Sequence, residues 1–273
     1  MTARKDPRLA VGVDIGGSGI KAAVVDVDAG ELVADRVRHK TPEGGKPDDV
    51  AEVAATVLAE VLQAGPEPTT GETVGVGFPA VVQHGVTRTA ANVHEDWVDA
   101  PAAELLTKAL GRRAVVANDA DVAGLAEVRF GAGRDVPGVV VVTTLGTGIG
   151  SALFVDGTLV PNTEFGHLEI DGEDAEKRAA DSAREREDLS WKDWAKRLQR
   201  YYTLLELLLQ PDLVVVGGGV SKKHDKFLPL LDLRAPIVPA QLRNEAGIIG
   251  AAVMAAELDA AGPTAGTPAK ETA

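Results

Sequence analysis

Residues 11–21 read Val-Gly-Val-Asp-Ile-Gly-Gly-Ser-Gly-Ile-Lys, and the rest of the chain is best interpreted from this stretch. An apolar run over residues 9–13 ends in Asp14, and a second apolar run covers residues 20–27. Two β-branched runs on either side of a glycine-rich turn are typical of a β-hairpin. Because glycines carry no side chain, the backbone N–H groups of such a turn can approach an anion such as phosphate.

Phosphate binding at this turn would involve the turn residues and the charged groups beside them. The candidate residues for binding phosphate or a nucleotide are Asp14, Gly16, Gly17, Ser18, Gly19 and Lys21. Asp14 by itself disfavours phosphate, because two negative charges repel each other. Its position is explained if Mg²⁺, or water bound to the ion, lies between the carboxylate and the phosphate. Glycine-rich hairpins that bind nothing are common, so this turn alone does not establish a site.

Two further strand-to-glycine turns follow later in the chain. Residues 139–151 read Val-Val-Val-Val-Thr-Thr-Leu-Gly-Thr-Gly-Ile-Gly-Ser, and residues 213–221 read Leu-Val-Val-Val-Gly-Gly-Gly-Val-Ser. No Gly-Lys-Ser/Thr follows the glycines, which excludes a Walker A loop, and the spacing is not that of a dinucleotide fingerprint. Three such turns predict a cleft between two lobes that holds a phosphorylated ligand. The further candidates for phosphate or nucleotide binding are Thr144, Gly146, Thr147, Gly148, Gly217, Gly218 and Gly219.

A pair of polar residues, Asn118-Asp119, follows a short apolar run at residues 114–117, and a helical pattern begins at once. In a parallel α/β sheet, reactive groups gather at the carboxyl ends of the strands. A carboxylate at that position can accept a proton from a substrate hydroxyl. An isolated Asn-Asp pair is more commonly a helix cap. Because three glycine turns accompany this pair, we predict that Asp119 is a catalytic base.

Five motifs, in this order, resemble those of the repressor, open-reading-frame and kinase (ROK) family of sugar kinases. They are Asp14-Ile-Gly-Gly-Ser-Gly-Ile-Lys, Asn118-Asp119, Thr144-Leu-Gly-Thr-Gly-Ile-Gly, Glu164-Phe-Gly-His167 and Gly217-Gly-Gly-Val-Ser. The match covers roughly residues 9–257, and more narrowly it resembles the bacterial polyphosphate glucokinases. The resemblance implies an α/β fold of the two-lobed actin-like ATPase (ribonuclease H-like) type, with the active site in a cleft between the lobes.

The resemblance also implies a sugar site. It makes Asp119 the base, and the expected sugar ligands are Asn92, Asn118, Glu164, His167 and Glu176. A carboxylate and an imidazole three residues apart suit hydrogen bonds to neighbouring hydroxyls, although without the other motifs they would be interpreted as a surface glutamate and a structural histidine. Glu169 and Glu173 are rivals of Glu176 for the last contact.

Many ROK kinases combine the histidine of this motif with three cysteines in a structural zinc site. This chain has no cysteine, so the resemblance to the polyphosphate-using branch implies that no zinc is bound. The lack of cysteine also excludes disulfides and thiolate metal sites, and it fits a cytoplasmic protein. We recognise no signal peptide at the N-terminus.

The composition of the chain excludes several classes of protein. The 273 residues are enough for two lobes, and 45% hydrophobic and 25% charged residues are ordinary for a soluble globular protein. No run of 18 uncharged apolar residues occurs, so no membrane span is expected. The net charge of −13 argues against a broad nucleic-acid surface. Since the first glycine turn begins at residue 11, we expect no DNA-binding module of the kind found in ROK repressors.

The chain is expected to divide into an N-terminal lobe (residues 1–117), a C-terminal lobe (residues 118–245), a terminal helix that packs back on the first lobe (residues 246–258) and a disordered tail (residues 259–273). Residues 171–188 are dense in charge and are interpreted as a solvated helix or a mobile lid.

A long helix after Ser190 carries a wide apolar face, which we interpret as a weak indication of a homodimer. Lys222, Lys223, Lys226, Arg234 and Arg243 follow the third glycine turn. Such a cluster could hold a polyanionic donor against the global repulsion of an acidic chain. An ordinary lysine-bearing helix is an equally good explanation.

The resemblance, together with these observations, implies a glucokinase. Glucose would lie in the cleft, Asp119 would take the proton from the 6-hydroxyl, and the donor would be polyphosphate, ATP or both, with Mg²⁺ as cofactor. The alternatives are an ATP-only glucokinase, a kinase for mannose, fructose or an N-acetylhexosamine, and a non-catalytic sugar-sensing protein. The expected partners are therefore glucose, the phosphoryl donor and a second copy of the chain.

Overall fold

The first glycine turn forms the hairpin that the sequence predicts. In the computed structural model, which describes residues 6–90 and 93–262, β1 (Leu9–Gly16) and β2 (Gly19–Asp26) pair antiparallel, and Gly16 lies opposite Gly19. Both strands are buried for most of their length because their alternating faces both pack against other elements.

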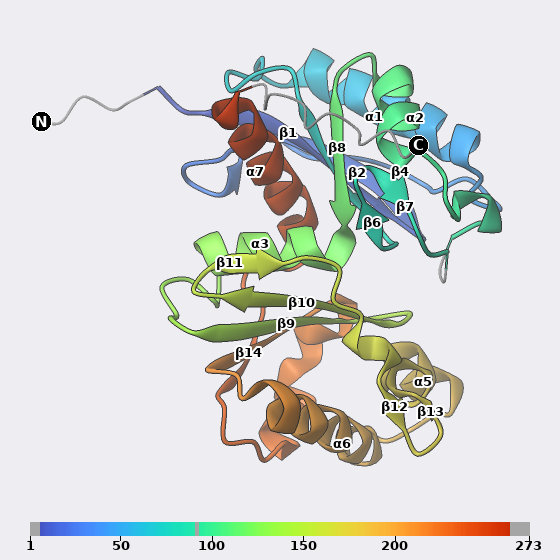
Figure 1. Ribbon diagram of the computed structural model, residues 1–273, viewed down its shortest axis with the longest axis vertical. Coiled ribbons are helices and arrows are strands. Elements are labelled where there is room, and N and C mark those ends of the chain that lie inside the picture. Colours follow the sequence, from blue (N-terminus) through green and yellow to red (C-terminus); the bar gives the residue numbers. More distant parts are fainter. Residues whose placement is uncertain (1–5, 91–92, 263–273) are drawn as a thin grey trace, which may run out of the picture.

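This hairpin belongs to the sheet of the N-terminal lobe (Figure 1). The strand order is β3-β2-β1-β5-β8, and β4 also pairs with β2. The strand bounds are β3 (Glu31–Leu32), β4 (Val37–His39), β5 (Val74–Phe78) and β8 (Ala114–Asn118). Because β1, β5 and β8 run parallel, Asp14, Phe78 and Asn118 lie toward one edge of the sheet.

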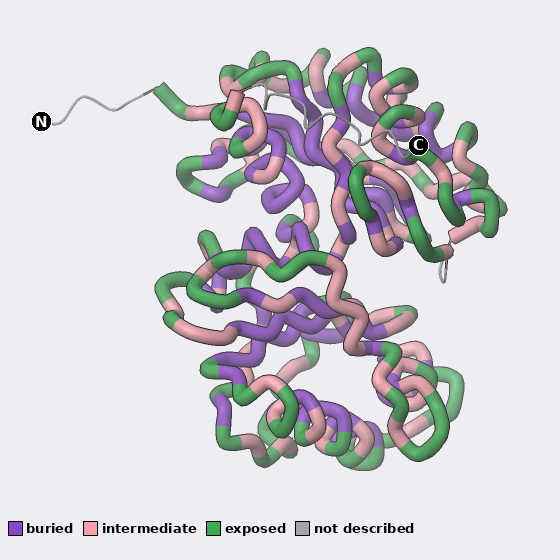
Figure 2. The backbone as a smooth tube through the Cα atoms, in the orientation of Figure 1, coloured by how far each residue is buried: buried purple, intermediate pink, exposed green. Residues whose placement is uncertain are grey.

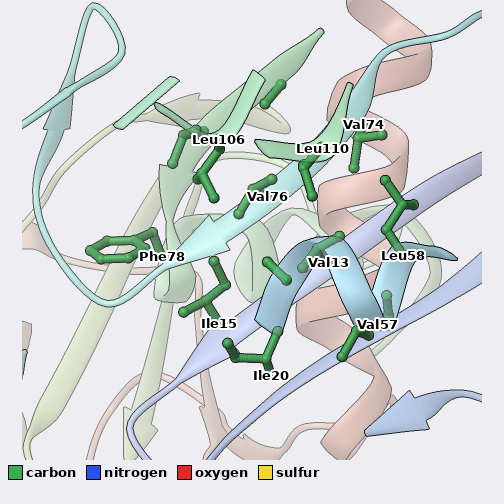
Figure 3. Packing of buried hydrophobic residues seen from close by; sticks show 14 of the residues in the cluster. Val13, Ile15, Ile20, Val57, Leu58, Val74, Val76, Phe78, Leu106 and Leu110 are labelled. Atoms are coloured by element: carbon green, nitrogen blue, oxygen red, sulfur yellow. The ribbon is translucent and has the colours of Figure 1, made fainter. Parts of the chain in front are cut away.

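Two helices, α1 (Pro47–Ala64) and α2 (Ala102–Leu110), cover one face of this sheet. Figure 3 shows the core between them, in which Val57 and Leu58 of α1 and Leu106 of α2 lie over the strand residues Val13 and Val76. A separate small hairpin, β6 (Val82–Gln83) with β7 (Val86–Thr87), and η1 (Glu95–Trp97) complete the lobe.

The C-terminal lobe contains the other large sheet, with the strand order β11-β10-β9-β14-β15. The strand bounds are β9 (Val139–Leu145), β10 (Ile149–Val155), β11 (Thr158–Val160), β14 (Leu213–Gly217) and β15 (Ile237–Pro239). The second glycine turn joins β9 to β10, and the third follows β14, which runs parallel to β9. The carboxyl ends of β9 and β14 therefore bring both turns to the same edge.

One face of this second sheet packs against α6 (Trp191–Leu209), below it in Figure 1. The smaller elements of the lobe are η2 (Phe165–His167), β12 (Glu169–Ile170), β13 (Glu173–Asp174), α4 (Ala175–Ala179), α5 (Asp181–Arg186), η3 (Gly219–Lys226), η4 (Leu228–Leu230) and η5 (Arg243–Glu245).

Two helices, α3 (Asp119–Phe130) and α7 (Ala246–Ala261), lie between the two sheets and pack on each other. Figure 2 shows that the buried backbone continues from one lobe to the other through this layer. The sequence predicts close packing of the last helix, and the structure supplies the reason. A Cβ at Gly12 or Gly75 would overlap the backbone carbonyls of Ile248 and Ala251, so only glycine lets α7 lie directly on β1 and β5.

Two expectations about the C-terminal half need correction. The last helix ends at Ala261 and not at residue 258, because Asp259 accepts hydrogen bonds from the backbone and hydroxyl of Thr73, which hold the last turn on the N-terminal lobe. Of the two expectations for residues 171–188, the helical one is confirmed, since the stretch contains α4 and α5, and Ala179, Ala180 and Ala183 are buried under α6. The rest of the expected disordered tail, residues 263–273, lies outside the described residues.

The second correction concerns the wide apolar face of α6. Trp194, Leu198, Tyr201, Tyr202 and Leu205 are all buried within the chain itself. The interpretation of this face as surplus apolar surface was therefore wrong, because the sheet of the same lobe already covers it. Leu207 and Leu208, near the end of the helix, remain 67% and 57% exposed. Among the described residues, no helix combines the length and the apolar content that crossing a membrane requires.

Candidate active site

A cleft of about 580 Å³ lies between the two lobes, and most of the predicted site residues line it. The hairpin tip contributes Gly17 and Ser18, the end of β8 contributes Asn118 and Asp119, and the region after β11 contributes Glu164, His167 and Glu176. The second and third glycine turns contribute Thr144, Gly146, Thr147, Gly148 and Gly218. Segments that are up to 200 residues apart in the sequence thus meet at one surface.

Asn118 and Asp119 lie where β8 ends and α3 begins. The Asn118 side chain caps the helix, since its Oδ1 accepts the N–H groups of Ala120 (2.8 Å) and Asp121 (3.2 Å). Its Nδ2 donates to the carbonyl oxygen of Ala80 at 3.2 Å. Asn118 therefore fixes the start of the helix and ties it to the strand-end loop of the neighbouring β5, while one of its amide hydrogens has no partner among the described residues. The helix cap is thus Asn118, and its neighbour Asp119 remains available as the base.

The Asp119 carboxyl group is in an environment that suits a general base. Its pKa is raised to about 7, chiefly by burial and next by the charge of Asp14, with smaller increases from the charges of Glu164 and Asp121. The N–H of Ala120, which donates to Oδ1 at 2.8 Å, acts in the opposite direction. A carboxyl group with a pKa near neutrality can accept a proton near neutral pH and is a much stronger base than an ordinary aspartate.

A second carboxyl group, Asp121, lies one position beyond Ala120 and was not predicted as part of the site. It is 1% exposed, its Oδ2 accepts the N–H of Asn162 at 2.8 Å, and its Oδ1 has no partner among the described residues. Its pKa is raised to about 7, chiefly by burial and also by the charge of Glu164, although the Asn162 N–H acts to lower it. The two segments are 41 residues apart, and no sequence pattern links them.

Asn162 in turn joins the two lobes. Its Oδ1 accepts the N–H of Val82 and its Nδ2 donates to the carbonyl oxygen of the same residue, both at 2.9 Å. The Asn162 backbone has a positive φ of 60°, a conformation that asparagine tolerates better than most residues. Val82 follows closely after the cleft residues Pro79 and Ala80. This side-chain bridge, which we call the Asn162 clasp, therefore lies two residues from Glu164 and beside the cleft.

The predicted sugar ligands of the C-terminal lobe form one cluster. His167 Nε2 lies 3.8 Å from Glu164 Oε2, and His167 Nδ1 lies 3.3 Å from Asp174 and 3.9 Å from Glu176. Burial raises the pKa of Glu164, His167 lowers it, and Glu176 raises it. Several hydrogen-bond acceptors and an imidazole thus face the cleft at short spacing, as recognition of adjacent hydroxyl groups requires.

The structure also distinguishes the three rival glutamates. Glu176 lines the cleft, and its Oε2 accepts the N–H of Ile149 at 3.1 Å, so the backbone beside the second glycine turn holds its orientation. Glu169 and Glu173 are exposed and belong to the small β12–β13 ribbon, outside the cleft lining. Asp174, which contacts His167, was missed because nothing in its sequence neighbourhood marks it.

The second and third glycine turns touch each other. A Cβ at Gly218, which has a φ of 81°, would overlap the carbonyl oxygen of Leu145, so the two turns can meet only with glycine there. Ser182 of α5 holds the second turn from the other side, because its hydroxyl donates to Thr147 O at 2.6 Å and its N–H donates to Gly146 O at 3.0 Å.

The first turn is arranged differently from the expectation. Lys21 Nζ pairs with Asp14 Oδ2 at 2.9 Å, directly across the hairpin, and neither residue lines the cleft. Gly16 lines a smaller neighbouring cavity of about 260 Å³, and Gly19 lies under the Arg38 side chain. Arg38, a cation that no sequence motif marks, donates to the carbonyl oxygen of Ser18 at 3.0 Å.

The remaining predicted residues are absent from the cleft lining. Gly217 is buried at the end of β14, and Gly219 begins η3. Asn92, the other expected sugar ligand, lies outside the described residues. Within residues 6–90 and 93–262, no group of three or more histidine and acidic side chains is arranged to hold a metal ion.

The model of the ROK family matches residues 10–184, which is more than half of the chain. The chain belongs to the ROK family. The match begins in β1 and ends in α5, so it includes the hairpin, the start of α3, the second glycine turn and the His167 cluster.

This chain is also similar to individual ROK proteins over most of its length. The polyphosphate glucokinase of Mycobacterium tuberculosis strain CDC 1551 / Oshkosh is 49% identical over 243 residues, which cover 89% of either protein. The crystal structure of the inorganic polyphosphate/ATP-glucomannokinase of Arthrobacter sp. strain KM is 55% identical, has a TM-score of 0.88, and covers 92% of this chain and 99% of its own. A ROK glucokinase of Streptomyces griseus, at 24% identity and a TM-score of 0.79, shares the fold over 91% of this chain and 99% of its own. The expected two-lobed actin-like ATPase fold is therefore confirmed.

Proposed function

We propose that this ROK protein is a glucokinase that transfers a phosphoryl group from inorganic polyphosphate, and also from ATP, to the 6-hydroxyl of glucose. One observation carries the proposal. Asp119, with a pKa of about 7, lies in the same cleft as both the glycine turns and the Glu164–His167–Glu176 cluster. A base between a hydroxyl-binding cluster and phosphate-binding turns is the arrangement that phosphoryl transfer to a sugar requires.

The reaction follows from these positions. Glucose is held by Asn118, Glu164, His167 and Glu176, with Asn92 as a further ligand. The Asp119 carboxylate takes the proton of the 6-hydroxyl while that oxygen attacks the terminal phosphorus of the donor. The bond from phosphorus to the bridging oxygen breaks, and polyphosphate shortened by one unit, or ADP, leaves with the electron pair.

The donor phosphates are held by backbone N–H groups of the turns around Gly17, Gly146 and Gly218, which are free of side chains at the cleft. Opposing lobes provide these groups, so closure of the cleft would surround the transferred phosphate and exclude water.

Mg²⁺ fits this chemistry as a cofactor. Asp14 and Asp119 lie close enough that the charge of Asp14 raises the Asp119 pKa, and Mg²⁺ is typically bound by one or two carboxylates together with substrate phosphates. Asp14 would hold the ion, through water because Lys21 already occupies one of its oxygens. The bound ion would supply charge neutralisation of the transferred phosphoryl group. Lys21 would keep Asp14 oriented.

The similarity to a glucomannokinase favours mannose as a second acceptor. Mannose differs from glucose only at the 2-position, so discrimination depends on the part of the cleft that surrounds that hydroxyl. We also propose a homodimer in the cytoplasm. The exposed Leu207, Leu208 and Leu230 support association, and the lack of cysteine fits a reducing compartment.

The experiment that tests the function is the formation of glucose 6-phosphate by the purified protein with Mg²⁺, measured separately with polyphosphate and with ATP. Turnover on polyphosphate at a rate comparable to or above that on ATP supports the proposal. Turnover on ATP alone would keep the base and the sugar site but remove polyphosphate as donor. Turnover with neither donor, on glucose or mannose, would contradict the proposed function.

A further inference from the structure

Three cationic side chains gather around one aromatic ring beside the third glycine turn. The guanidinium carbon of Arg184 lies 4.4 Å from the centre of the Trp191 ring, and the Nζ atoms of Lys223 and Lys226 lie 5.8 Å and 5.6 Å from it. The three cations come from α5 and η3, and the ring stands at the first position of α6. We call these four residues the Trp191 cluster.

The positive charge of this cluster is only partly neutralised. Arg184 pairs with Asp181 at 2.7 Å and with Glu185 at 3.1 Å. Lys223 and Lys226 form no ion pair with any described residue, although Asp225 lies between them in the sequence and the chain carries 41 acidic residues. The face of an aromatic ring attracts cations, but it does not remove the repulsion between the positively charged side chains. Unpaired like charges held together in an acidic protein favour an anionic ligand.

Both segments that carry the cations are attached to the phosphate end of the cleft. Arg184 follows two residues after Ser182, whose hydroxyl and N–H hold Thr147 and Gly146 of the second turn. η3 starts at Gly219, immediately after the cleft residue Gly218. The cluster therefore lies on the segments that lead away from the turns where the terminal phosphates are proposed to bind.

The structure separates these cations from the others of the same stretch of sequence. Arg234 is 3.7 Å from Glu206 and donates to Gln210 near the far end of α6. Arg243 lines a different cavity, with His224 and Gln241. Only Lys223 and Lys226 of the cluster predicted from the sequence meet at Trp191, and Arg184, from a distant segment, joins them.

We propose that the Trp191 cluster binds the distal phosphates of a polyphosphate chain whose terminal phosphate lies at Asp119. This inference rests on the proposed function and assigns the donor tail to named residues. Arg184 and the two lysines contact successive phosphates, and the Trp191 ring holds the three side chains in place. Only a donor that extends beyond the glycine turns reaches the cluster, so it discriminates long polyphosphate from short donors.

The test is the double variant Lys223→Gln/Lys226→Gln, compared with the unmodified protein. The KM for long-chain polyphosphate should rise about tenfold or more and depend less steeply on salt, because two phosphate contacts are lost. The kcat at saturation, the KM for glucose and the KM values for tripolyphosphate and ATP should each stay within about twofold. Lys192→Gln/Lys196→Gln, which makes the same charge change on exposed positions of α6, is the control and should leave all constants unchanged.

A second readout does not depend on turnover. Trp97 and Trp194 are 0% exposed, whereas Trp191 is only partly buried. Long-chain polyphosphate without glucose should therefore change the tryptophan fluorescence of the unmodified protein, and Trp191→Phe should remove most of that change. An unaltered fluorescence response in Trp191→Phe would contradict a site at this ring.

The outcomes distinguish this inference from the function on which it rests. If the unmodified protein does not use polyphosphate, both are wrong. If it uses polyphosphate and the lysine variant keeps the long-chain KM, or matches the control variant, only the Trp191 site is wrong. An equal rise in the KM values for ATP and tripolyphosphate would also overturn it, because the cations would then serve the phosphates that all donors share.

Discussion

The two sides of the first turn of α3 carry similar carboxyl groups in different surroundings. The pKa of both Asp119 and Asp121 is raised to about 7, with burial as the largest cause. Asp119 lines the cleft, where a substrate hydroxyl can reach it. Asp121 is 1% exposed on the side of the helix where the lobes meet, and there it holds the backbone of Asn162. A raised pKa by itself therefore does not identify the base.

The two carboxyl groups differ in whether a substrate can reach them and in the residue that each one contacts. A general base must reach the proton that it removes. Asp121 cannot do so, because it is 1% exposed, does not line the cleft, and already accepts the Asn162 N–H. We interpret Asp121 as a positioning residue for the clasp and Asp119 as the catalytic residue.

The largest expected effect separates the two carboxyl groups directly. Asp119→Asn should lower kcat by about 10³-fold or more, because general base catalysis and the carboxylate charge are both lost, while glucose binding should be retained. Asp121→Asn is the matched control and should keep most of the activity, since an amide oxygen can still accept the Asn162 N–H. For each variant, steady-state kinetics measures kcat and calorimetry measures glucose binding. Substantial turnover by Asp119→Asn would remove Asp119 from the mechanism.

The second prediction concerns the clasp. Asn162→Gly keeps a backbone that tolerates the positive φ and deletes both side-chain hydrogen bonds to Val82. Each bond contributes about 0.5–1.5 kcal/mol, so kcat/KM for glucose should fall about tenfold, mainly through KM, because the adjacent Glu164 loses its fixed position. Asn162→Ala should add a loss of thermal stability from backbone strain. An unchanged KM for glucose in the folded glycine variant would show that the clasp does not position the sugar site.

The third prediction uses the pH dependence of the rate. Since the base must be ionised, kcat/KM should be constant above pH about 7 and should fall with a slope of one below it. Asp121→Asn should move this fall to slightly lower pH, because one of the negative charges that raise the Asp119 pKa is gone. If the ionisation of Asp121 governed the pH profile, the fall of kcat/KM at low pH would instead disappear in Asp121→Asn.

The last prediction concerns the stability of the protein. Asp121 is protonated in the folded protein up to pH about 7 but ionises near pH 4 when unfolded. Between these values the folded state binds more protons, so this group makes the free energy of unfolding fall as pH rises. Relative to the unmodified protein, Asp121→Asn should therefore become more stable from pH 4 to pH 7, by on the order of 3 kcal/mol. Denaturant titrations at several pH values measure the difference, and a difference independent of pH would contradict the assigned environment.

Much of the fold was visible in the sequence because it is encoded locally. The three glycine turns and the long helix after Ser190, whose hydroxyl accepts the N–H of Asp193, all depend on neighbouring residues. The close-packed last helix could be predicted from its alanines and glycines. Its true end at Ala261 could not, because the hydrogen bonds of Asp259 to Thr73 join residues 186 positions apart.

The sequence by itself determined the order of the glycine turns, the strand end that carries Asp119 and the family motifs around Glu164 and His167, since each is a short pattern with a local physical cause. Only the tertiary structure decided which cations meet at Trp191, that Glu176 and not Glu169 faces the cleft, and that Asp121 holds the clasp. These contacts depend on how two sheets pack across α3 and α7. Packing of this kind is a property of the whole chain, which no short stretch of residues encodes.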